Sequence, residues 1–98
     1  MEAPALAQLI GGYFHQDWTD EFASVAEAVS AFISNTPDLA PELPAEIKEL
    51  LRDTSTDAEV ESYLDGLGNQ YTVREGEGGY RGWLASIAAR VRAATSQA

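Results

Sequence analysis

Apolar residues recur at the three- and four-residue spacing of an α-helix along nearly the whole chain of 98 residues. This spacing gathers apolar side chains on one face and predicts amphipathic helices. The chain has no alternating apolar and polar stretch of strand length and no internal repeat. The sequence therefore predicts an all-α fold, a compact bundle of four to five short helices. We expect a single domain over residues 1–98, with residues 1–3 and 95–98 frayed.

Five apolar stripes define the expected helices. Their members are Leu6, Leu9, Ile10, Tyr13 and Phe14; Val25, Val29, Phe32 and Ile33; Ile47, Leu50 and Leu51; Val60, Tyr63, Leu64 and Leu67; and Tyr80, Trp83, Leu84, Ile87 and Val91. In the third helix, the charged residues that alternate with the stripe are expected to face solvent: Glu46, Lys48, Glu49 and Arg52.

Several residues indicate where helices begin and end. Ser24–Glu27 and Thr56–Glu59 have the pattern of a capping box, in which two side chains satisfy unpaired backbone N–H groups. Pro44 suits an early helical position. The pair Gly11-Gly12 is expected to weaken or end the first helix, because glycine loses much backbone entropy there. Residues 69–79 are rich in glycine and predict a loop.

Two further helix ends follow from proline and glycine. The segment Asn35–Pro37 is expected to end the second helix, because the residue before a proline disfavours helical dihedral angles. Gly66 and Gly68 are candidates for the left-handed position that follows a helix C-terminus. The fourth helix should therefore stop close to them.

The net charge of −10 is concentrated in one part of the chain. Residues 15–65 contain thirteen acidic and two basic residues, whereas residues 66–98 are slightly basic. Binding to a nucleic-acid backbone is not expected, because it requires clustered Lys and Arg. A basic protein partner fits the charge better. The simpler alternative is that the acidity only keeps the chain soluble.

The sequence offers little material for catalysis or for a cofactor. The chain has no cysteine, and His15 is its only histidine. His15 and Asp17 form an H-x-D pair, but zinc sites use three or four protein ligands, so we expect no metal. We interpret His15 as hydrogen-bonded at a helix end. The glycine-rich stretches lack the lysine of a phosphate-binding loop. We expect no enzyme activity and no cofactor.

The sequence also bears on where the chain acts. No apolar run approaches the ~20 residues that a membrane span requires. The N-terminus lacks the basic flank of a secretory signal. A chain without cysteine is compatible with the cytoplasm, where we expect it to act, with no contact to a membrane.

Two aromatic clusters stand out. The first is the run Tyr13, Phe14, His15, Gln16, Asp17 and Trp18, and the second contains Tyr80, Arg81, Trp83 and Leu84. One interpretation is packing, since buried Tyr and Trp rings contribute large apolar areas. The other is an exposed recognition patch, because Tyr, Trp and Arg dominate interface hot spots. We favour packing for both clusters.

The stretch from Leu9 to Trp18, which reads LIGGYFHQDW, resembles the signature of small bacterial immunity proteins of contact-dependent growth inhibition systems, the CdiI-like group linked to polymorphic toxins. The later LGNQY of residues 67–71 and YRGWL of residues 80–84 resemble further motifs of that family. Thr72–Glu75 and Gly82 depart from its pattern. The resemblance covers nearly the whole chain. It implies a small, non-enzymatic helical protein that binds and blocks a cognate toxin domain in the cytoplasm.

The resulting hypothesis is an immunity protein that neutralises a toxin by direct, stoichiometric binding, as a monomer when free. A basic toxin, for instance a nuclease, would suit the acidic segment. The residues expected to contact it are Asp17, Asp20, Glu21, Glu42, Glu46 and Glu49. Two alternatives remain: an acidic helical adaptor or regulatory module that binds a basic protein, and a metal-dependent hydrolase that uses His15 and Asp17.

Overall fold

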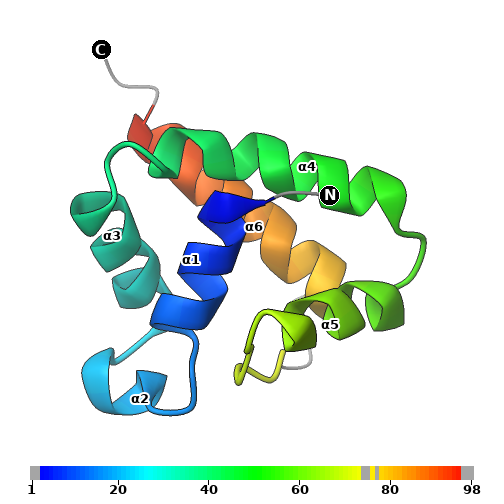
Figure 1. Cartoon of the computed structure of the whole chain (residues 1–98), viewed down its shortest axis with the longest axis horizontal. Helices are drawn as coiled ribbons and strands as arrows, with labels where there is room; N and C mark the ends of the chain where they lie inside the picture. Colours follow the sequence, from blue (N-terminus) through cyan, green and yellow to red (C-terminus); the bar gives the residue numbers. More distant parts are fainter. Residues whose placement is uncertain (1–2, 74–75, 77, 96–98) are drawn as a thin grey trace.

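The structure, a computed structural model, describes residues 3–73, 76 and 78–95 (Figure 1). Its elements are α1 (Pro4–Tyr13), α2 (Trp18–Glu21), α3 (Val25–Asn35), the 3-10 helix η1 (Ala40–Glu42), α4 (Leu43–Asp53), α5 (Asp57–Gly66) and α6 (Gly79–Thr95). The described residues contain no strand, which confirms the all-α class. The predicted number of helices is too low, because the four-residue helix α2 forms where the apolar spacing indicates none.

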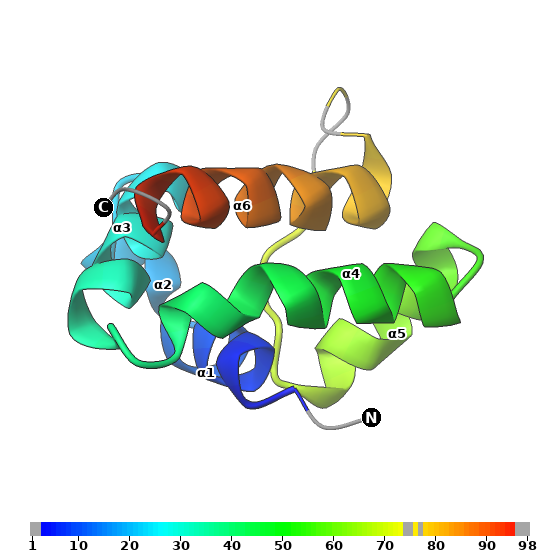
Figure 2. The ribbon, with the colours of Figure 1, turned by 90° about the horizontal axis from the view of Figure 1, so that it is seen from above.

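Helices α4 and α6 lie side by side and run in opposite directions (Figure 2). Helix α1 contacts α3 and α4, and α5 contacts α6 near its beginning. The apolar stripes of these helices meet in one core, as the periodicity predicts. The largest fully buried side chains are Trp83, Phe14, Phe32, Leu6, Leu9, Ile10, Leu43, Ile47, Leu64, Leu84, Ile87 and Val29.

Helices α3 and α5 begin at the two predicted caps. The Ser24 hydroxyl accepts a hydrogen bond from the Glu27 backbone N–H at 3.2 Å. At Thr56 the capping box is complete, because the Glu59 carboxylate also accepts the Thr56 N–H at 3.1 Å. Helix α3 ends at Asn35, the first residue of the segment Asn35–Pro37 that the sequence predicts to end it. The local sequence signals therefore place these helix termini well.

Glycines have different roles at the ends of α5 and α1. Gly68 has a φ of 93°, and the N–H groups of Gly68 and Asn69 bond the carbonyls of Asp65 and Leu64. This is a Schellman end, as expected for Gly68. Gly11, in contrast, does not end α1. A Cβ at Gly11 would lie 3.3 Å from the Leu67 carbonyl oxygen, so glycine lets α1 approach the end of α5 closely.

Two of the residues that the sequence predicts to fray belong to the folded part of the chain. Ala3 is buried, and Thr95 is the last residue of α6. The other residues expected to fray lie outside the described residues. Among the helices of the described part, none has the length and apolar content that a membrane crossing needs.

Candidate functional site

The aromatic rings of the two sequence clusters meet inside the molecule. The Phe14 ring centroid lies 5.4 Å from that of Trp18 and 5.3 Å from that of Trp83. Tyr71, from the segment after α5, stacks on Trp83 at 4.7 Å and meets Trp18 at 5.4 Å. The Gln70 backbone N–H also donates to the Phe14 carbonyl at 2.8 Å. These contacts tie α1, α2 and α6 to the segment that follows α5.

Tyr13 joins a second group of rings on the other side of α1. Its ring lies 5.7 Å from Phe22 and 5.8 Å from Phe32, and its hydroxyl accepts a hydrogen bond from the Asn35 side chain at 3.2 Å. Tyr13, Phe14, Trp83 and Leu84 are buried, whereas Trp18 and Tyr80 are half-buried. The rings of both clusters thus pack mainly into the fold.

The polar middle of the first cluster faces outward. His15 Nδ1 accepts the Asp17 backbone N–H at 3.1 Å, and His15 Nε2 lies 2.6 Å from Glu21 Oε2. The imidazole therefore bridges the start and the end of α2. Gln16 and Asp17 are exposed. The H-x-D pair makes its contact through a backbone N–H. No group of three or more metal-binding side chains occurs in the described part of the chain.

Three acidic residues of this region, Asp17, Asp20 and Glu21, form what we call the α2 acidic cluster. All three are exposed, and α2 buries none of its own residues. Its attachment to the core depends on the half-buried Trp18. The α2 acidic cluster therefore projects from the body of the molecule at one end (Figure 1).

The other three predicted contact residues belong to η1 and α4 and do not share one environment. Glu42 and Glu49 are exposed. Glu46 is half-buried, and its carboxylate accepts the backbone N–H groups of Leu6 at 2.8 Å and Ala5 at 3.2 Å. These N–H groups belong to the first turn of α1, which lacks a capping side chain of its own. The expectation that Glu46 faces solvent is therefore corrected: Glu46 caps α1.

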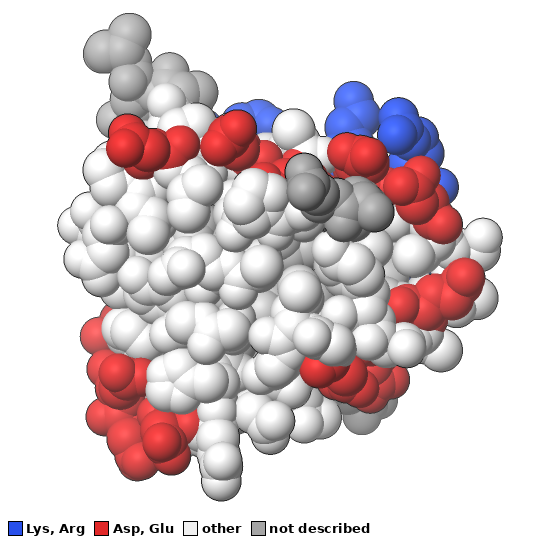
Figure 3. Space-filling view, in the orientation of Figure 1, with Lys and Arg blue, Asp and Glu red and all other residues white. Residues whose placement is uncertain are grey.

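The structure does not bring the six predicted acids into one patch. Residues 3–14, which include all of α1, contain no acidic or basic residue. The exposed part of this stretch, which we call the α1 face, comprises Pro4, Gln8, Gly11 and Gly12 within α1. Figure 3 shows acidic side chains along the upper edge and at the lower left, with an uncharged surface between them. Sequence reasoning missed this surface, although the charge-free run is visible in the sequence.

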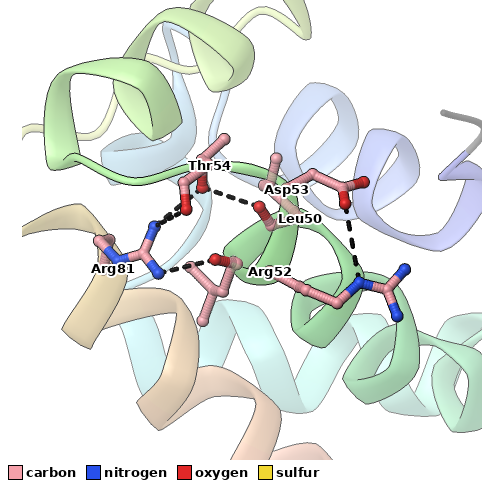
Figure 4. Close-up of polar contacts among 6 residues, drawn as sticks. Leu50, Arg52, Asp53, Thr54 and Arg81 are labelled. Atoms are coloured by element: carbon pink, nitrogen blue, oxygen red, sulfur yellow. Dashed lines mark hydrogen bonds and ion pairs between the residues drawn. The ribbon is translucent and has the colours of Figure 1, made fainter.

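Arg81 of the second cluster joins α6 to the end of α4 (Figure 4). Its guanidinium donates to the Leu51 carbonyl at 2.7 Å, to the Thr54 carbonyl at 3.0 Å and to the Thr54 hydroxyl at 2.9 Å. These carbonyls at the C-terminus of α4 have no partner within the helix, so a cation there is favourable. Arg81 thus serves the fold as a cap between helices.

An acidic side chain caps the beginning of α6. The Arg81 backbone N–H donates to Asp57 Oδ1 at 3.0 Å. Gly79 has a φ of 71°, and a Cβ there would collide with the Asp57 carboxylate, so glycine admits this contact. Next to it, burial raises the pKa of the Tyr80 hydroxyl, and the nearby Glu61 carboxylate adds to the rise. This corner is built from contacts that stabilise the fold.

Comparisons with known proteins identify the family. No curated protein and no solved structure matches the chain. One protein-family model, described as the CdiI immunity protein, matches residues 2–91. This range covers every described helix except the last four residues of α6. The chain therefore belongs to the CdiI immunity protein family.

Proposed function

We propose that this chain neutralises a cognate toxin domain by binding it directly in a stoichiometric complex, without catalysis and without a cofactor. Family membership supports the immunity role, since the family is described as immunity proteins. We further propose that the chain acts in the cytoplasm and is a monomer before it meets the toxin. No contact with nucleic acid or membrane is part of this function.

The observation that carries the proposed binding mode is the α1 face with acids on two sides of it. Protein interfaces have a core depleted in charged residues and a polar rim. The α1 face has no charged side chain. Helix α2, with the α2 acidic cluster, lies on one side of it, and α4, which carries Glu49 and directly follows Glu42 of η1, lies on the other (Figures 1 and 3). We propose that the toxin covers the α1 face and contacts acids of both groups.

The charges fit a basic partner. In the described part of the chain, Asp17, Asp20, Glu42 and Glu49 take part in no ion pair. Exposed charges of this kind accelerate encounter with an oppositely charged surface and select the partner, whereas affinity depends on a few well-packed contacts. A basic nuclease, whose cleft must neutralise phosphates, is a toxin that such a surface would suit.

Growth rescue tests this function. We expect that co-expression of this chain with the toxin domain encoded beside it restores growth, and that the two purified proteins form a 1:1 complex by light scattering. Rescue without a complex would contradict direct binding. Neither rescue nor a complex would contradict the immunity role, and stable capture of a basic housekeeping protein would then favour the adaptor alternative.

A bulky substitution tests the binding mode separately. Gln8→Trp places a large ring on the exposed side of α1, and Ala89→Trp places the same ring on the exposed side of α6. If the toxin covers the α1 face, Gln8→Trp weakens binding by about tenfold or more, whereas Ala89→Trp changes it little. Equal affinities of both variants and the wild type would place the toxin elsewhere.

A further inference from the structure

An apolar groove of about 210 Å³ lies between α4 and α6. Its lining residues are Pro44, Ile47, Lys48 and Leu51 from α4, and Ala85, Ala88 and Arg92 from α6. The two helices run side by side in opposite directions (Figure 2), and residues of both helices line the groove. We call this feature the α4–α6 groove.

Side-chain size explains why the groove exists. On α6, Ala85 and Ala88 are too small to fill the space opposite the larger residues of α4. Leu51 consequently remains half-buried, although it belongs to an apolar stripe whose other members, Ile47 and Leu50, are almost completely buried. Protein interiors normally leave little unfilled space between packed elements. Apolar surface is therefore available here to a partner.

The groove also carries two cations that have no acidic partner among the described residues. Lys48 and Arg92 are exposed and take part in no ion pair with any residue that the structure describes. The basic residues nearby are engaged differently: Arg52 lies 3.7 Å from the Asp53 carboxylate, and Arg81 binds carbonyls. In a chain with a net charge of −10, the α4–α6 groove thus combines an apolar floor with cations on both walls.

We propose that the α4–α6 groove binds an acidic amphipathic helix of the toxin domain. Apolar side chains of that helix fill the space over Leu51 and Ala85, and its carboxylates pair with Lys48 and Arg92. The small residues Ala85 and Ala88 allow a helix backbone to approach closely. This inference rests on the proposed function, because it takes the toxin as the partner.

The size of the groove favours a peptide segment over a small molecule. Pockets for drug-sized ligands typically measure about 300–1,000 Å³, which exceeds the 210 Å³ found here. A groove of this size holds one or two apolar side chains, as in the recognition of an amphipathic helix laid into a groove. The two cations add a requirement for carboxylates next to those side chains.

Charge argues against a second copy of this chain as the occupant. A twofold pairing of groove with groove would place Lys48 and Arg92 of both copies against one another, and juxtaposed like charges oppose association. A toxin with one basic and one acidic region avoids this conflict. It would meet the acids around the α1 face with the first region and the α4–α6 groove with the second, which would fix its orientation.

Charge reversal with a matched control tests the groove. The groove variant carries Lys48→Glu and Arg92→Glu, and the control carries Arg52→Glu and Arg90→Glu. Each pair changes one cation on α4 and one on α6 and shifts the net charge equally, and Arg52 and Arg90 are exposed and do not line the groove. By titration calorimetry with the toxin domain, we expect the groove variant to bind about tenfold or more weakly and the control to stay within about threefold of the wild type.

A second pair of variants tests the apolar part of the proposal. Ala85→Trp fills the groove with a ring, and Ala89→Trp places the same ring on the exposed side of α6 outside it. We expect only Ala85→Trp to weaken toxin binding, by about tenfold. Circular dichroism of all variants checks that the helices are retained.

The outcomes separate this proposal from the proposed function. If the wild type binds the toxin and the groove variants bind as tightly as their controls, the α4–α6 groove proposal is wrong and the immunity function stands. If the wild type binds no toxin, both are wrong. If sedimentation shows that the wild type self-associates and that Ala85→Trp abolishes this, the groove belongs to a second copy and the proposal is overturned.

Discussion

Two sets of carboxylates in this molecule carry the same charge and do different things. The α2 acidic cluster consists of exposed side chains, and among the residues that the structure describes only Glu21 of this cluster has an ion-pair partner, His15. The capping carboxylates Glu46, Asp57 and Glu59 instead accept backbone N–H groups at the beginnings of α1, α6 and α5. Net charge alone therefore overstates the acidity available to a partner. Position relative to a helix N-terminus decides the role of each carboxylate.

The largest expected effect on stability comes from removing Arg81, the cation that caps the C-terminus of α4. Arg81→Ala removes three hydrogen bonds and leaves the carbonyls of Leu51 and Thr54 without the guanidinium. We expect the free energy of unfolding to fall by about 2–3 kcal/mol, because hydrogen bonds to charged groups contribute more than neutral ones. Urea denaturation measures the loss. Arg90→Ala, at an exposed site on the same helix, should stay within about 0.5 kcal/mol of the wild type.

The next effect separates Glu46 from Glu49, an exposed acid of the same helix. Glu46→Ala leaves the N–H groups of Ala5 and Leu6 without an acceptor, so we expect a loss of about 1–2 kcal/mol, in the range of a helix cap. Glu49→Ala is the matched control at an exposed site of the same helix. Equal stability of the two variants in urea would mean that the cap at α1 contributes nothing measurable.

The α2 acidic cluster should show the opposite pattern. Asp17→Lys with Asp20→Lys is expected to change the free energy of unfolding by less than about 0.5 kcal/mol per site, because neither side chain takes part in an ion pair in the described structure. Association with a basic toxin domain should slow by about tenfold at low salt and recover part of the difference as salt rises. Stopped-flow fluorescence measures the rate constant.

The control for that experiment is Asp38→Lys, a charge reversal at an exposed site in the connection between α3 and η1. Asp38→Lys reverses one charge and the double variant reverses two. We expect Asp38→Lys to slow association by less than half of the logarithmic effect of the double variant. A rate that follows only the net charge, wherever the substitution lies, would show that the α2 acidic cluster has no special part in binding. A rate that does not respond to salt would remove the electrostatic argument.

The smallest effect concerns the pH dependence of stability. The backbone N–H groups of Ser55 and then of Thr56 hold the pKa of Glu59 below its ordinary value. Its stabilising contribution is therefore complete above the ordinary pKa of about 4.3 and is lost as the pH falls through the lower pKa of the folded chain. We expect the acid side of the stability curve to be less steep in Glu59→Gln than in the wild type. Glu61→Gln, on the same helix, is the control for the loss of one carboxylate.

The sequence predicts those parts of the fold that depend on neighbouring residues. The capping box at Thr56, the helix end at Gly68 and the start of α3 at Ser24 are all encoded within a few positions. The sequence does not predict contacts between residues that lie far apart in the chain. Glu46 caps a helix that begins about forty residues earlier, and Arg81 binds carbonyls about thirty residues before it. No local pattern specifies such partners.

The candidate site likewise has features that the local sequence predicts and features that depend on the packed fold. Burial of Tyr13 and Phe14 agrees with their helical spacing, and the charge-free stretch that forms the α1 face can be read directly from residues 3–14. The α4–α6 groove could not be predicted, because it depends on which residues of α6 face Leu51. The choice among the six predicted acids likewise required the fold, since only the packed structure distinguishes Glu46 from Glu49.

The meeting of Trp18 and Trp83 on Tyr71 gives the protein a built-in optical reporter. These are the only two tryptophans of the chain, and both belong to one ring cluster that spans α2 and α6. Trp83 is almost completely enclosed, whereas Trp18 is partly open to solvent beside the α2 acidic cluster. Intrinsic emission and near-ultraviolet dichroism therefore report on the docking of α2 without any added label. A ligand that covers or lifts this short helix changes the contribution of Trp18 to these signals.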